Sequence, residues 1–119
     1  MELQSGTKIL AIFSGTVVYT GFSGAGGFTV TVKSNEFTAS YCHVSPQYIV
    51  SVGEYVLKGT TIANVGPKNV YGVLNNPYKD SFGNSTNGAT TGPHLHLTIK
   101  KDGQAVNPLD YISSSSLSS

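Results

Sequence analysis

The stretch Thr91-Gly92-Pro93-His94-Leu95-His96-Leu97 constrains the structure of this chain more than any other. Gly92 and Pro93 predict a turn, and the residues after them alternate as in a strand. Side chains two apart on a strand share a face, so Leu95 and Leu97 would point into a core while His94 and His96 open onto one space. Two imidazoles in one space suit a metal site or a proton-transfer site. An ordinary half-buried strand is the alternative.

The length and composition of the chain favour a single small domain. Its 119 residues are enough for one hydrophobic core. All seven basic residues are Lys, against six carboxylates. This argues against nucleic acid or phosphate as the main ligand, because phosphate and guanine recognition favours Arg. The low charged fraction of 11% is typical of an extracellular, cell-wall-facing or virion-associated protein.

The chain shows neither a membrane span nor a secretion signal. No apolar run is long enough to cross a bilayer, and no basic region with a following apolar region comes after Met1. Residues Ser113–Ser119 are rich in Ser, which predicts a tail or linker after the domain.

Short β-strands are predicted throughout. The predicted segments are rich in Val, Ile, Thr, Phe and Tyr and are bounded by Gly, Ser or Asn, and no stretch of helical length has an apolar 3.6-residue period. The fold class is therefore all-β, a compact antiparallel β-sandwich or partly open barrel. The predicted strands are Lys8–Ile12, Thr16–Thr20, Phe28–Lys33, Phe37–His43, Thr60–Val65 and His94–Lys100.

One long loop interrupts the strands. Residues Lys68–Ala89 are polar and rich in Asn and Gly, and such a loop is either functional or a floppy insertion. Its aromatic residues Tyr71, Tyr78 and Phe82 suit the wall of a binding groove, or a docking site for a neighbouring subunit.

The single cysteine cannot form an internal disulfide. Strand alternation places Cys42 on the opposite face from His43. A nucleophile activated by that histidine is therefore disfavoured, and a buried structural thiol is predicted.

Taken together, four groups of residues resemble the LytM-type M23 metallopeptidase domain over Gly6 to Ile112. The long loop interrupts the match. The first group is similar to that domain's opening hairpin, the second to its Tyr-x-His-Leu-Ser element, the third to its Gly-punctuated segment and the fourth to its His-x-His end. In the same order, the first group is Gly6-Thr7 with Ala11, Ser14–Val18 and Gly21, and the second is Tyr41–Ser45. The third group is Val52–Gly66, and the fourth is Thr91–Ile99 with Gly103, Val106–Pro108 and Tyr111-Ile112.

The resemblance implies a zinc endopeptidase that cuts peptide cross-links of bacterial peptidoglycan. Carried over by position, His96 matches a zinc ligand, and His43 and His94 match the two catalytic histidines that assist the zinc-bound water. Tyr41, together with the aromatic residues of the long loop, is expected to line the substrate groove.

The chain departs from the family pattern at the other two zinc ligands. The His-x-x-x-Asp motif of the family precedes the Gly-Thr that matches Gly6-Thr7, and here only Met1–Ser5 stand before it. His43 is followed four residues later by Gln47, and neither Glu2 nor Asp80 is at a matching position. A lone imidazole does not hold a catalytic zinc.

Three hypotheses follow. The domain, residues 1–112, is degenerate and serves as a binding or assembly module for peptidoglycan peptides, with residues 113–119 as a tail. Alternatively it is N-terminally truncated, and an absent segment or another chain supplies the missing ligands of an active endopeptidase. Thirdly, His43, His94 and His96 form a tris-imidazole zinc site. Other subunits of a virion, such as a phage tail, or of a cell-envelope assembly are the further partners expected.

A carrier domain is a hypothesis of another class. The hairpin-like Gly53–Gly66 segment is similar to biotinyl- and lipoyl-carrier domains, with Lys58 as the attachment site. The residues around Lys58 lack the pattern of such lysines, and His94 and His96 stay unexplained.

Overall fold

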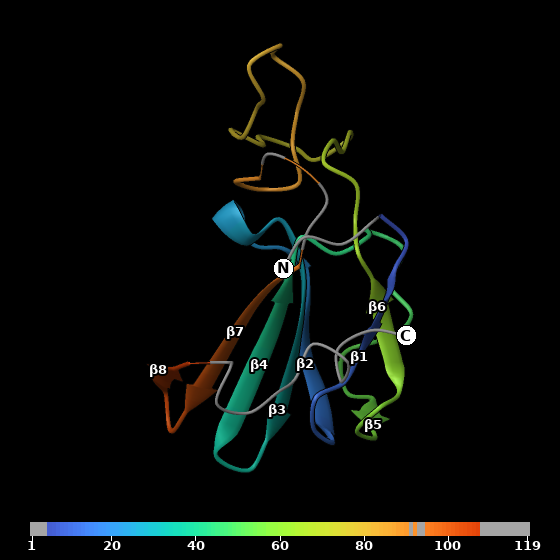
Figure 1. Cartoon of the computed structure of the whole chain (residues 1–119), viewed down its shortest axis with the longest axis vertical. Coiled ribbons are helices and arrows are strands. Elements are labelled where there is room, and N and C mark those ends of the chain that lie inside the picture. The colour runs from blue at the N-terminus through green and yellow to red at the C-terminus, as the bar shows by residue number, and fades with distance from the viewer. Residues whose placement is uncertain (1–4, 91, 93–94, 108–119) are drawn as a thin grey trace.

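The computed structural model describes residues 5–90, 92 and 95–107, which form two antiparallel sheets (Figure 1). The larger sheet has six strands in the order β5-β2-β3-β4-β7-β8, and the smaller one pairs β1 with β6. A 3-10 turn, η1 (Gly24–Gly26), joins β2 to β3. The strands are β1 (Lys8–Leu10), β2 (Gly15–Phe22), β3 (Phe28–Ser34), β4 (Phe37–Cys42), β5 (Tyr55–Val56), β6 (Thr61–Asn64), β7 (His96–Lys101) and β8 (Gln104–Val106).

This architecture confirms the predicted all-β fold, and the sheets do not close into a barrel. Six of the strands fall where they were predicted, and the short edge strands β5 and β8 were missed. The β7–β8 hairpin turns through Asp102 and Gly103, which both have positive φ as a two-residue type I′ turn requires. The described part of the chain contains no helix with the length and apolar character that a membrane crossing needs.

The core lies between the two sheets and explains the alternation of the sequence. Strands β3 and β7 turn their aliphatic side chains toward β1 and β6, and each buried Val, Leu or Ile stabilises the fold by roughly 1.5–3 kcal/mol. The opposite face of the large sheet is left with Thr, Ser, Cys, His and Lys side chains. The core residues of the large sheet are Val17, Val30, Val32, Ala39, Tyr41, Val56, Leu97 and Ile99.

The long loop forms an ordered arm beyond the end of the sheet where β7 begins (Figure 1). Isolated bridges join Asn69 to Thr86 and Lys79 to Ser85. The Asp80 carboxylate accepts hydrogen bonds from the backbone N–H groups of Phe82 and Asn84 at 2.9 and 3.0 Å, and forms an ion pair with Lys68 at 3.1 Å. Together these contacts, the Asn84 hydrogen bond foremost, hold the pKa of the Asp80 carboxyl well below its ordinary range. The floppy-insertion alternative is therefore not supported.

Candidate functional site

The polar face of the large sheet forms the floor of a groove of about 470 Å³. The cross-strand register arranges this polar face in three rows, of which the third reaches beyond the groove lining at Lys33 and Thr38. The first row is Thr29, Cys42 and His96; the second is Tyr19, Thr31, Ser40 and Thr98; the third is Lys33, Thr38 and Lys100. In the second row the hydroxyls of Thr31 and Ser40 are hydrogen-bonded at 3.0 Å, so the middle of the floor is uncharged and rich in hydroxyl groups.

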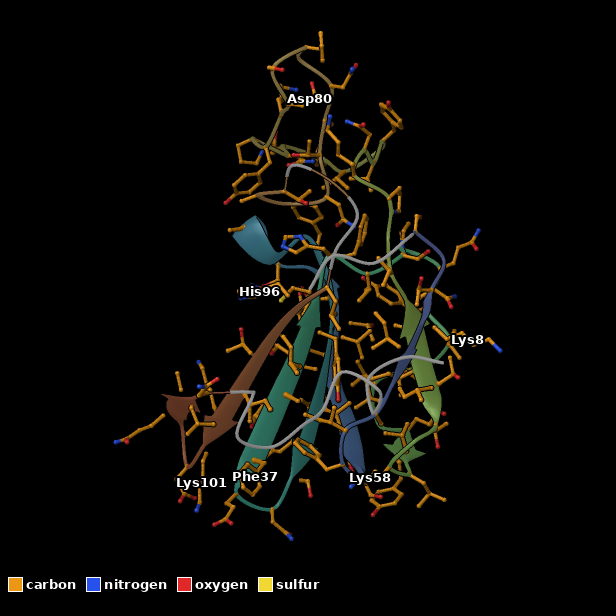
Figure 2. The ribbon with its side chains drawn as sticks, viewed as in Figure 1. Lys8, Phe37, Lys58, Asp80, His96 and Lys101 are labelled. Carbon is orange, nitrogen blue, oxygen red and sulfur yellow. The ribbon has the colours of Figure 1, made fainter. Side chains whose placement is uncertain are left out.

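Two imidazoles meet at the end of the groove that the arm overhangs. His96 is the first residue of β7 and is exposed, and Figure 2 shows it at the opposite end of that strand from Lys101. His43 directly follows β4 and is 5% exposed. The centroids of the two rings lie 6.3 Å apart at an interplanar angle of 74°. Both residues line a smaller cavity of about 260 Å³, which shares Gly26 and His96 with the groove.

The backbone of His43 leaves the strand in the left-handed region, with φ of 62°. His is among the few side chains found there with some frequency. The backbone N–H of His43 donates to Gly26 O at 2.8 Å, and His43 O accepts from the Gly66 N–H at 3.0 Å. These two bonds fix the turn that brings the imidazole into the cavity beside His96.

Asn87, at the base of the arm, orients the His43 ring. His43 Nδ1 lies 2.6 Å from Asn87 O, and because a carbonyl oxygen only accepts, Nδ1 carries the proton. The fully buried Asn87 side chain accepts from the Phe28 N–H at 2.8 Å and donates to Val44 O at 3.0 Å. One residue therefore joins the arm, the start of β3 and the end of β4 around His43.

Two glycines make room for this network. A Cβ at Gly27, whose φ is 63°, would clash with both oxygens of Asn87. A Cβ at Gly66 would clash with Val44 O and with Asn87 Nδ2. Only glycine fits at these close backbone approaches.

Cys42 is a buried thiol, as predicted, but its surroundings differ from those predicted. It is 8% exposed and lies in the first row between Thr29 and His96, so it borders the groove. The turn at His43, with its positive φ, breaks the strand alternation, so that Cys42 pairs in register with His96 while the His43 ring lies 6.3 Å from the His96 ring. Burial raises the pKa of the Cys42 thiol, with the Thr29 side chain opposing the shift, so the thiolate needed for nucleophilic attack is disfavoured.

Tyr41 was expected in the substrate groove, and the structure corrects this. It is fully buried in the core, on the other face of the sheet, because strand alternation points it away from Cys42 and Ser40. Its hydroxyl accepts a hydrogen bond from the Ile12 N–H at 3.1 Å. Burial, opposed by that hydrogen bond, raises the pKa of Tyr41 to about 12.

The predicted aromatic residues of the arm lie outside both cavities. Tyr71 and Phe82 are 75% and 85% exposed, and Tyr78 is half-buried. None of the three is among the residues that line the groove or the smaller cavity. His94 lies outside the described residues.

The donor set available for zinc falls short in the described part of the chain. Within residues 5–90, 92 and 95–107, no three His, Cys, Asp or Glu side chains are grouped closely enough to hold a metal ion. His43 and His96 are two imidazoles, whereas a catalytic zinc takes three protein ligands and an open position. The described residues therefore do not fit a catalytic zinc by themselves.

Two features of the site were not predicted from the sequence, the polar groove floor and the role of Asn87. Alternation could have revealed the groove floor, since Thr29, Thr31 and Lys33 share the face opposite Val30 and Val32. No local signal marks Asn87, whose partners Phe28 and His43 are 59 and 44 residues away.

The sequence of the chain matches known proteins along most of its length. A model of peptidase family M23 matches residues 1–77. The chain is 31% identical over 110 residues to an uncharacterized metalloprotease of Haemophilus influenzae, a match that covers 91% of the chain and 19% of the relative. It is 33% identical over 112 residues to the lipoprotein NlpD/LppB homolog of Pseudomonas aeruginosa, with 92% of the chain and 30% of the relative covered. The chain thus spans less than a third of either relative.

The fold matches that of a solved peptidase. The catalytic domain of the antimicrobial peptidase lysostaphin from Staphylococcus simulans superposes with a TM-score of 0.70 at 27% identity, covering 92% of this chain and 73% of that one. These matches replace the carrier-domain hypothesis for the Gly53–Gly66 segment. The chain belongs to peptidase family M23.

Proposed function

We propose that this chain is an M23 domain that binds peptides of bacterial peptidoglycan in its groove, and that its own residues do not complete the zinc site needed for hydrolysis. One observation carries the proposal. His43 and His96 meet at the end of the groove, and no third candidate ligand of the described residues is grouped with them. Imidazoles and hydroxyls above a rigid sheet suit hydrogen bonding to a peptide backbone.

An active zinc endopeptidase is the second candidate. The hydrogen bond between His43 Nδ1 and Asn87 O favours it, because functional imidazoles are commonly oriented by a backbone carbonyl. His96 would then be a zinc ligand, with His43 and His94 assisting the water. Residues outside the described ranges or another chain would supply the missing ligands, and a site of all three histidines is a further form of this candidate.

We place this binding at the cell envelope or in a virion such as a phage tail. The lipoprotein relative supports the envelope setting. Other subunits of the same assembly would be partners of the domain, taken as residues 1–112 with a Ser-rich tail over 113–119.

Co-sedimentation with purified peptidoglycan, combined with assay of released peptides at added zinc, tests the proposal. The chain should sediment with peptidoglycan and release nothing, and His96→Ala should sediment less. Lys58→Ala is the matched surface control, since Lys58 lies far from His96 in Figure 2. Release of peptides by the chain but not by His96→Ala would establish the endopeptidase instead, and absence of sedimentation would refute binding.

A further inference from the structure

We infer that a carboxylate-binding subsite lies at the far end of the groove, formed by Lys100, which lines the groove, and by Lys33, which lies beside the groove on the same face of the sheet. This rests on the proposed function and specifies the ligand, an extended acidic peptide. Lys100 lines the groove four residues along β7 from His96. At a rise of about 3.3 Å per residue, the subsite lies roughly 13 Å from the imidazole end.

The register places the two lysines around one threonine. Thr38 pairs with Lys33 on one side and with Lys100 on the other, so all three belong to the third row of the polar face. Two strand spacings separate the lysine backbones by about 10 Å, a span that two lysine side chains can close over Thr38. Both ammonium groups can therefore reach one carboxylate held above this threonine.

The two charges are available for a ligand. The ion pair found in the described part of the chain joins Lys68 to Asp80 in the arm and involves neither lysine of the third row. Within the part of the chain that the structure describes, no Asp or Glu lines the groove. The nearby turns carry Glu36 and Asp102, which are linked through Asp102 N–H and Glu36 O and form no ion pair with either lysine.

The side chains in the middle of the groove restrict the chemistry of the part of the ligand that lies between His96 and the two lysines. The second row offers hydroxyls of Thr31, Ser40 and Thr98 rather than an apolar pocket. Hydroxyls serve as both donors and acceptors for a peptide backbone. An extended peptide of about four residues would span from His96 to the lysines, and a negative group at its end would match their charge.

Lys101 provides a matched control on the same strand. It pairs with Phe37, and its Nζ lies 5.8 Å from the centroid of the Phe37 ring, on the face away from the groove. Lys101→Gln therefore removes the same charge as Lys100→Gln one residue further along, without touching the subsite.

The experiment compares two synthetic probes, the peptidoglycan stem tetrapeptide Ala-γ-D-Glu-Lys-D-Ala with free carboxylates and the same peptide with its carboxylates amidated. Binding to the full chain is measured by calorimetry at low salt. The wild-type chain should prefer the acid by about fivefold, as expected for exposed charge pairs. Lys33→Gln with Lys100→Gln should abolish the preference, and Lys101→Gln should keep it.

The outcomes separate the two proposals. Equal affinity of the wild-type chain for both probes overturns the subsite while groove binding stands. Lys100→Gln alone should weaken the preference; an equal loss of preference in Lys101→Gln also overturns the subsite, because general electrostatics would then explain the effect. If neither probe binds the wild-type chain, the proposed function and the subsite both fail.

Discussion

At one end of the groove His43 is buried and held by a network of backbone contacts, whereas at the other end Lys33 and Lys100 project from a regular ladder of strands. The imidazole end depends on Asn87, which joins three segments distant in sequence. The lysine end depends on no contact beyond the sheet itself. Substitutions at the first end should therefore affect folding as well as binding, and those at the second end should affect binding alone.

The largest effect is expected from Asn87→Ala. This change leaves the Phe28 N–H and Val44 O without their partners in a buried place, which should cost about 3 kcal/mol of unfolding free energy. Urea unfolding measures the loss. Asn84→Ala, at an exposed position of the same arm, should change stability by less than about 0.5 kcal/mol. Similar losses in both variants would contradict the role of Asn87.

Next in size is an alkaline loss of stability from Tyr41, which lies under the floor of the groove. Its pKa is raised from 10.0 to about 12, so the folded state binds the proton more tightly than the unfolded state. Stability is complete below pH 10 and should fall by about 1.4 kcal/mol per pH unit as pH rises toward 12.

Urea unfolding between pH 9 and about 12 checks this slope. Tyr41→Phe should be less stable at neutral pH by about 1 kcal/mol, because the Ile12 N–H loses its acceptor, and its alkaline slope should be shallower. An unchanged slope in Tyr41→Phe would show that Tyr41 is not the group responsible.

A smaller, local effect is expected in the arm that overhangs the imidazole end. Asp80→Ala removes the acceptor for Phe82 and Asn84 and the partner of Lys68, so amide hydrogen exchange over residues 82–86 should accelerate. The pKa of the Asp80 carboxyl is lowered in the folded state. Its contribution to stability is therefore present at every pH above the ordinary carboxyl pKa, and it is lost only in strong acid. Asp102→Ala, in the β7–β8 turn, is the control and should leave the arm unchanged. If the amides of residues 82–86 stay protected from exchange in Asp80→Ala, contacts other than those of Asp80 keep the arm ordered.

The smallest effect on folding belongs to the lysine end. Lys33→Gln and Lys100→Gln should each change the unfolding free energy by less than about 0.5 kcal/mol, since neither lysine forms an ion pair with a described residue. Thermal unfolding compared with Asn87→Ala sharpens the contrast between the two ends. If either lysine variant destabilised the fold as much as Asn87→Ala does, the two ends of the groove would not differ in their importance for folding.

The sequence predicted the sheet well because side-chain alternation is local. Leu95 and Leu97 are buried and His96 is exposed, as the spacing of the opening motif required. The short β8 was missed although Asp102-Gly103 is a strong hairpin signal. The same alternation, applied to residues 37–42, predicts that Tyr41 points into the core and not into the groove.

The site was harder to predict because its geometry arises from long-range contacts. Placing Cys42 and His43 on opposite faces assumed a strand that continues, whereas the φ of 62° at His43 ends it. The carbonyl that orients His43 comes from a residue 44 positions away, at the base of a loop without strand periodicity. Only tertiary structure brings these groups together.

The central claim, that this chain's own residues do not complete a zinc site, is tested most directly by native mass spectrometry of the full chain after incubation with zinc and removal of the excess. We predict no stoichiometric zinc, and the same spectrum for His96→Ala. One zinc ion per wild-type chain, lost in His96→Ala, would contradict the claim and establish a metal centre at the end of the groove.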